Sequence, residues 1–246
     1  MNLDNGIAEL CLDYPPVNAF NGQGWIDLSK EINNLSSNDE VRVVIIRSNG
    51  KGFCAGVDIK ELAEDSNKIV EVNRGCYESF KAVRACNVPV ISAVHGFCLG
   101  GGVGLVGASD IIIASDDAYF GLPEVDRGAL GAASHLARMF PLQHVRRMMF
   151  TAEPIDAMEA YRLGALEKVV SKDNLLSSAM SLANKIAEKS PLAIRLAKES
   201  LNGIESHDVD KSYLYEQGFT LKLYESDDST EARKAFVEKR EADFKD

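Results

Sequence analysis

The 246-residue sequence has few of the residues that build metal centres or disulfide scaffolds. Its five cysteines are scattered and odd in number, no two form a Cys-x-x-Cys pair, and only four histidines accompany them. This pattern disfavours a zinc site or a disulfide framework, because both need clustered ligands at regular spacing. We therefore predict no bound metal, and we expect reduced thiols that are buried as small apolar side chains.

The sequence also lacks a long apolar run and a basic leader. Its longest apolar stretch, residues 88–94, has the length of a buried strand and is far shorter than the ~18–20 residues of a membrane helix. Residues 1–6 show neither the basic nor the apolar segment of a signal peptide. We therefore expect a cytoplasmic protein without a membrane partner.

The sequence is also short of positively charged residues. Lysine and arginine number 27 against 37 acidic residues, which gives a net charge of −10. This balance disfavours nucleic acid as a partner. An anionic cofactor remains compatible, because at a screening length of about 8–10 Å a few local lysines outweigh distant acidic groups.

The apolar spacing predicts strands alternating with helices in the first part of the chain. Strands are expected at residues 7–13, 41–47, 89–94 and 110–114, and helices at residues 21–35 and 67–86. After residue 131 the pattern is almost entirely helical. Together these features indicate an α/β fold with a core over residues 1–189 and a helical region over residues 190–246, which could pack on another subunit.

Two glycine-flanked turns are the first candidates for chemistry. Gly56 permits a tight bend that leaves neighbouring N–H groups outside a sheet. Three consecutive glycines, at residues 100–102, precede an apolar helix and would present free N–H donors to a ligand. Such a triplet also serves close helix packing or a flexible turn. A dinucleotide-binding loop is disfavoured, because the G-x-G-x-x-G spacing in an opening βαβ unit is absent.

Three segments in combination resemble the crotonase (enoyl-CoA hydratase/isomerase) superfamily. They read FCAGVDIKE at residues 53–61, VPVISAVHGFCLGGG at 88–102 and FGLPEV at 120–125, and the similarity runs over residues 7–244. The resemblance implies a spiral of ββα units with C-terminal helices that form a homotrimer or a hexamer. It also implies an acyl-CoA thioester substrate, no tightly bound cofactor, and an oxyanion hole made of the backbone N–H groups of Val57 and Gly101.

The resemblance further assigns positions that contact coenzyme A. The adenine and pantetheine contacts fall on the backbone around residue 57, at Ala55, Asp58 and Ile59, and the phosphates face Lys51 and Lys60. The terminal helix supplies an aromatic and a basic residue, Phe236 and Lys239. A lone lysine is equally compatible with a solvated surface position, and the terminal helix with plain amphipathic packing.

One family feature is missing. Hydratases of this family hold one water between two glutamates, and the first of these positions is Gly104 here, whereas the second is Glu124. Two-glutamate hydration is therefore excluded. We expect the space at Gly104 to hold a larger acyl group or a water, and Glu124 to be the acid/base group, with a pKa raised by an apolar pocket.

Residues 73–76, 114–118 and 122–133 resemble a hydrolytic subgroup that opens the rings of a bicyclic dioxo carboxyl-CoA in bacterial cholesterol degradation. In that chemistry Glu124 would activate water toward a ring ketone, and retro-Claisen cleavage would leave an enolate. Asp126, Arg127 and His135 could orient water or protonate the product, and Arg127 could bind a carboxylate or ketone. Each of the three is equally compatible with a structural or surface role.

Two other functions stay open. One is a single-carboxylate enoyl-CoA hydratase or isomerase of fatty-acid-type metabolism, and the other is a coenzyme A-binding homologue without catalysis.

Overall fold

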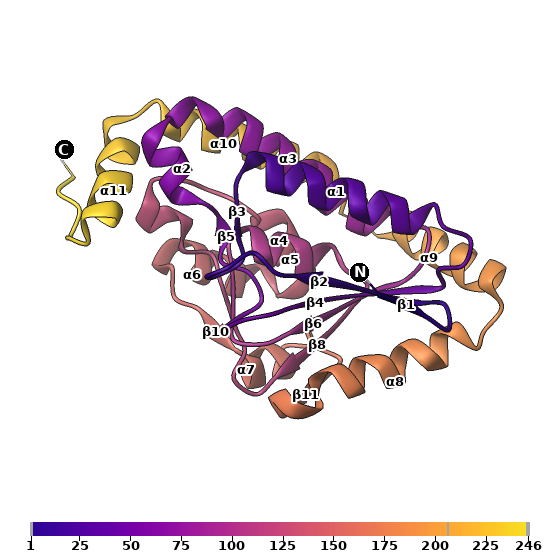
Figure 1. The fold of residues 1–246 in the computed structure, drawn as a ribbon. Helices are drawn as coiled ribbons and strands as arrows, with labels where there is room; N and C mark the ends of the chain where they lie inside the picture. The colour runs from indigo at the N-terminus through magenta and orange to yellow at the C-terminus, as the bar shows by residue number, and fades with distance from the viewer. Residues whose placement is uncertain (1, 206, 245–246) are drawn as a thin grey trace.

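The computed structural model describes residues 2–205 and 207–244 and has an α/β fold (Figure 1). The first part of the chain repeats a unit of one strand in a main sheet, one short strand beside it, and one or more helices. The four units are β2 (Ile7–Leu12), β3 (Ala19–Phe20) and α1 (Gly22–Ser36); β4 (Val43–Ser48), β5 (Gly56–Val57), α2 (Ile59–Glu64), η1 (Ser66–Lys68) and α3 (Ile69–Ala85); β6 (Val90–Val94), β7 (Phe97–Leu99) and α4 (Gly101–Ala108); β8 (Ile111–Ser115), β9 (Tyr119–Gly121), η2 (Pro123–Arg127) and α5 (Ala133–Met139).

The main sheet has six strands in the order β1-β2-β4-β6-β8-β11, where β1 is Asn2–Asp4 and β11 is Lys168–Val170. All neighbours pair in parallel except β1, which is antiparallel to β2. A parallel sheet covered on both faces needs continuous apolar strands, as the fully buried run Val43–Ile46 illustrates. In Figure 1 the sheet lies between α1 and α3 on one side and α8 (Leu175–Ala187) on the other.

The predicted spiral of ββα units is confirmed, and the predicted strands and helices agree with the observed ones to within about two residues at most ends. Beyond α5 the helices are α6 (Leu142–Thr151), α7 (Ala157–Arg162), α8, α9 (Pro191–Ile204), α10 (Val209–Tyr224) and α11 (Asp227–Glu238). The expectation of an almost purely helical second part missed β10 (Ile155–Asp156) and β11. Both are short strands that exist through pairing with the distant β9 and β8. Over residues 2–205 and 207–244, no helix is both long and apolar enough to cross a membrane.

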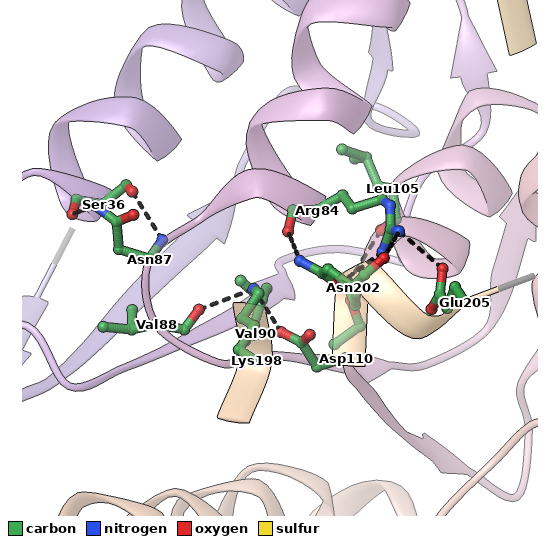
Figure 2. A network of polar contacts seen from close by, with 12 residues as sticks. Ser36, Arg84, Asn87, Val88, Val90, Leu105, Asp110, Lys198, Asn202 and Glu205 are labelled. Carbon is green, nitrogen blue, oxygen red and sulfur yellow. Dashed lines mark hydrogen bonds and ion pairs between the residues drawn. The ribbon is translucent and has the colours of Figure 1, made fainter. Parts of the chain in front are cut away.

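Buried polar contacts tie the C-terminal helices to the core (Figure 2). Lys198 of α9 is 6% exposed, donates to the Val88 carbonyl at 3.0 Å and pairs with Asp110 at 2.7 Å. Arg84 of α3 donates to Asn202 Oδ1 at 2.7 Å. Breaking such a buried ion pair by removing one partner typically costs about 3–5 kcal/mol. The predicted boundary at residue 190 is thus crossed by contacts that hold α9 in place.

Candidate active site

Three segments of the site occupy the same place in successive units of the spiral. Val57 ends β5, Gly101 follows β7, and Glu124 follows β9. Strands β7 and β9 pair in parallel, and an isolated parallel bridge joins Cys54 to Cys98. Because the carboxyl ends of parallel strands meet at one edge, the three segments come together there.

The backbone N–H groups of Val57 and Gly101 border one cavity. Asp58 N donates to Phe20 O at 2.9 Å, and since N–H groups alternate in direction along a strand, that of Val57 points away from β3. Gly101 begins α4, so its N–H has no acceptor within the helix. A Cβ added to Gly56 would lie only 2.9 Å from Gly101 N, so glycine permits this close approach. This arrangement agrees with the predicted oxyanion hole, and the role of the pair toward a substrate stays a prediction.

Glu124 lies directly against this hole. Gly100 has a φ of 54°, and a Cβ at that position would overlap Glu124 Oε1. Glu124 Oε2 is inaccessible to water and has no hydrogen-bond partner among the residues described. Burial raises the pKa of Glu124 to about 8, while the positive charge of Arg127 acts in the opposite direction. A carboxyl group with such a pKa exchanges protons readily near neutral pH.

The cavity is open to solvent and, together with its mouth, spans about 690 Å³ that no protein atom fills. Much of its wall is apolar and comes from three helices, α2, α3 and α10, and the loop before α5, through Ile59, Leu62, Ile69, Val72, Leu130 and Tyr213. Three polar atoms on this wall are inaccessible to water and have no partner within the described part of the chain: Asn73 Nδ2, Glu124 Oε2 and Arg127 Nε. An apolar pocket with a few unpaired polar groups is typical of a small-molecule site, in which a ligand satisfies them.

The residues predicted to contact coenzyme A lie in two kinds of position. Ala55 and Ile59 line the cavity next to Val57. Asp58 caps α2, because its side chain accepts a hydrogen bond from Lys60 N at 3.0 Å. The side chains of Lys51 and Lys60 are exposed and do not line the cavity. Their role toward phosphates stays a prediction.

The terminal helix packs over η2, the turn that carries Glu124. The Phe236 ring of α11 lies 4.6 Å from the Arg127 guanidinium carbon and is 43% exposed. Ser229 Oγ donates to Gly128 O, directly after η2. Lys239 is exposed and ends α11 with a φ of 56°. The stacking of Phe236 on Arg127 was not predicted, because 109 residues separate the two in sequence.

Asp126 and His135 are not brought to the cavity. The Asp126 side chain is exposed on η2. His135 of α5 is 1% exposed, and its ring centroid lies 4.9 Å from that of Phe80 and 5.0 Å from that of Tyr213. Burial lowers the pKa of His135 to about 3, so its ring is neutral at physiological pH. Of the three residues predicted beside Glu124, the structure therefore brings only Arg127 to the cavity.

The expectation of free space at Gly104 is wrong. A Cβ at Gly104 would overlap the Phe80 ring, so that ring occupies the volume of the missing carboxylate. Phe80 packs edge-on against Trp25 with centroids 5.6 Å apart and also contacts His135 and Tyr213. We call these four residues the aromatic cluster. Glycine at this position removes a proton-transfer group and at the same time lets the aromatic cluster pack against α4.

Sequence reasoning missed the contribution of α3 and α10 to the site. Asn73 and Cys76 of α3 line the cavity, as do Tyr213, Thr220 and Tyr224 of α10. The segment 73–76 carried part of the resemblance, but no chemical role was predicted for it. The one-turn spacing of Asn73 and Cys76, on the same stripe as Ile69 and Val72, was the available signal.

Comparison with known proteins agrees with this geometry. A profile of the enoyl-CoA hydratase/isomerase family matches residues 2–246. The chain is 50% identical over 236 residues to the (7aS)-7a-methyl-1,5-dioxo-2,3,5,6,7,7a-hexahydro-1H-indene-carboxyl-CoA hydrolase of Mycobacterium tuberculosis, covering 95% of this chain and 96% of that protein. It is 48% identical to the hydrolase of the same name from Rhodococcus jostii, covering 95% and 92%. A carnitinyl-CoA hydratase structure from Mycobacterium avium has a TM-score of 0.86 at 28% identity, covering 99% and 97%. The chain belongs to the enoyl-CoA hydratase/isomerase family, the crotonase superfamily.

Proposed function

We propose that this protein is an acyl-CoA hydrolase that opens a ring of a bicyclic dioxo carboxyl-CoA of steroid origin by adding water across a C–C bond. The observation that carries the proposal is the carboxylate of Glu124, whose Oε2 is inaccessible to water beside the proposed oxyanion hole, while the other carboxylate position is Gly104 with Phe80 packed on it. The relatives that are 50% and 48% identical are named for such a substrate. One carboxylate suffices to activate one water.

In the first step the thioester oxygen accepts hydrogen bonds from the N–H groups of Val57 and Gly101. Ionised Glu124 takes a proton from water, and the hydroxide adds to the carbon of a ring ketone. The ketone oxygen becomes an alkoxide, which the Arg127 guanidinium stabilises from the same short helix. Arg127 Nε has no hydrogen-bond partner among the described residues and is therefore available to donate to this oxygen.

In the second step the alkoxide collapses to a carboxylic acid, and the adjacent ring C–C bond breaks. The electron pair of that bond delocalises onto the thioester oxygen as an enolate, which the oxyanion hole stabilises. One donor of such a hole is typically worth about 2.7–4 kcal/mol of barrier. Protonated Glu124, whose pKa is raised to about 8, returns its proton to the carbanion. The sum is substrate plus one water, with the thioester intact.

The coenzyme A portion is proposed to run from the cavity along the start of α2. The support is that Ala55 and Ile59 line the cavity, while the charged end of Lys60 is exposed one residue further on. Asp58, Lys51, Phe236 and Lys239 complete the proposed contact set.

A homotrimer or a dimer of trimers in the cytoplasm is proposed as the assembly. The supporting observation is a series of exposed apolar side chains on the C-terminal helices, including Ile204 at 74% and Tyr215 at 73% exposure. Light scattering of the purified protein tests the assembly, and a monomer would contradict it.

The function is tested by incubating the protein with the bicyclic dioxo carboxyl-CoA in heavy-oxygen water. Mass spectrometry should show a gain of one water, one heavy oxygen in a new carboxylic acid, and coenzyme A still attached. Crotonyl-CoA serves as the control, and its enoyl absorbance should stay constant. An unchanged mass, or release of free coenzyme A thiol, would contradict the proposal. Loss of the enoyl absorbance would support the hydratase alternative.

A further inference from the structure

Asn73 presents an unpaired amide to the active-site cavity. The residue lies on α3 and lines the cavity, and its Nδ2 is inaccessible to water and has no partner among the described residues. Leaving a buried donor unpaired costs about 1–3 kcal/mol. Native proteins keep few such groups, and a ligand acceptor is one explanation when the group faces a cavity.

The position of Asn73 is set from two sides. Two residues on, Gly75 lies so close to α1 that an added Cβ would be 2.7 Å from Trp25 Cβ, so α3 is pinned there. From the other side, Gln217 of α10 donates to the Asn73 backbone oxygen at 2.6 Å. Gln217 itself is 8% exposed. The side chain of Asn73 is therefore attached to a rigid backbone, as is expected of a group that recognises a ligand.

The wall around Asn73 is apolar. Ile69 and Val72 flank it on α3, and Leu62 and Leu130 complete this side of the cavity. A single donor in such a wall recognises an oxygen on an otherwise hydrocarbon ligand, because it orients the ligand while the apolar groups bury its surface. The catalytic pair Glu124 and Arg127 enters the cavity from η2, a different element. Polar groups that can bind ring oxygens thus reach the cavity from two different elements, α3 and η2.

We propose that Asn73 donates a hydrogen bond to the ring ketone that is not attacked by water, and so selects dioxo over mono-oxo acyl-CoA substrates. This inference rests on the proposed function. The attacked ketone becomes the alkoxide beside Arg127 and then a carboxylic acid when its ring opens. The other ketone keeps its oxygen throughout and lies at Asn73.

The test uses Asn73→Leu, which removes the donor at nearly constant shape, and two substrates. One is the dioxo carboxyl-CoA, and the other is its analogue with a methylene in place of the uncleaved ketone. Asn73→Leu should lower kcat/KM for the dioxo substrate by about 10- to 100-fold, because one buried hydrogen-bonding group of the complex is then left unpaired. The kcat/KM for the analogue should stay unchanged. The melting temperature should stay the same or rise, because an unpaired buried donor is removed. Arg74→Ala, an exposed neighbour on α3, is the matched control and should change none of these values.

The outcomes separate the inference from the function on which it rests. Equal kcat/KM of wild type and Asn73→Leu on the dioxo substrate would overturn the inference and leave the hydrolase proposal standing. Equal losses on both substrates, or a lower melting temperature, would mean a structural role and would also overturn it. If the wild-type protein adds no water to the dioxo substrate, the proposed function fails and the inference fails with it.

Discussion

The proposed oxyanion hole and the proposed acyl-binding wall of this cavity are built in different ways. The hole uses backbone groups at Val57 and Gly101, each placed by a turn that immediately follows a short strand. The wall uses side chains of α2, α3, η2 and α10, with α11 packed over η2. Backbone donors recognise a carbonyl that every acyl-CoA has, whereas side chains distinguish one acyl group from another. If the proposed site is right, the hole serves any acyl-CoA, and the wall discriminates between acyl groups.

The two regions also differ in how much space they leave. On its protein side, the turn that carries Gly101 leaves none: a Cβ at Gly101 would lie 2.6 Å from Trp25 Cζ2, and one at Gly102 would lie 2.7 Å from Cys54 O. The wall instead leaves polar atoms of Asn73, Glu124 and Arg127 unpaired beside open volume. Changes in the hole should thus affect all substrates alike, and changes in the wall should be selective.

The largest effect is expected from Glu124→Gln. An amide cannot take the proton from water, so kcat for ring opening should fall by about 10²- to 10⁴-fold, the usual contribution of a general base. Binding of a coenzyme A product, measured by calorimetry, should be retained because the oxyanion hole is intact. Asp126→Asn on the same short helix is the matched control, since its side chain is exposed. Undiminished turnover by Glu124→Gln would refute the role of Glu124 as base.

Gly101→Ala should have the next largest effect. The new methyl group would collide with Trp25 and displace the donor, which should lower kcat by about 10²- to 10³-fold, as expected for loss of one oxyanion-hole donor. Steady-state kinetics on the dioxo substrate and on its mono-oxo analogue should show the same loss. Gly203→Ala on α9, where a Cβ meets no atom within 4 Å, is the control. A loss confined to one substrate would contradict the expectation that a change in the hole affects all substrates alike.

The pH dependence should follow Glu124. Its pKa is raised to about 8, and the base must be ionised, so the carboxylate form and the activity are lost as pH falls below that value. We expect kcat/KM to rise about tenfold per pH unit up to about pH 8 and then level off. Arg127→Leu removes a charge that lowers this pKa and should move the midpoint upward. A profile that falls with rising pH over this range would instead indicate that Glu124 acts as an acid.

The smallest effect, and one on stability alone, is expected from Gly104→Ala. The methyl group would overlap the Phe80 ring, and overpacking of this kind typically costs about 1–3 kcal/mol. Urea unfolding should show this loss. Gly218→Ala on α10, where a Cβ has open space, should cause none. An unchanged free energy of unfolding for Gly104→Ala would mean that Phe80 moves aside readily and that the volume is open after all.

The parts of the site that could be predicted from sequence are those with local causes. The turns at Gly56 and Gly101 depend on glycines next to strand ends, and Glu124 follows its strand by three residues. The longer strands and the first helices follow from apolar spacing, whereas the short strands β1, β3, β5, β7, β9, β10 and β11 were not predicted. The lysines Lys51 and Lys60 are found exposed, and their contacts with phosphate stay a prediction.

The parts that could not be predicted depend on packing between distant segments. Phe80 and Gly104 are on different helices, so nothing in the sequence indicates that one fills the volume left by the other. His135 has the chemistry of a proton donor, but burial in the aromatic cluster keeps it neutral and away from the cavity. Asn73 becomes a recognition group only because the cavity wall around it is apolar.

The sequence by itself determined where tight turns are permitted, because the glycines at 56 and 100–102 allow conformations and close approaches that other residues do not. The family resemblance in the sequence added the prediction that Val57 and Gly101 are the donors. It also determined that one carboxylate is present where hydratases of the family have two. Only the tertiary structure decided what surrounds that carboxylate. Burial of Glu124 and the rise of its pKa come from segments far apart in sequence, because these segments together line the cavity.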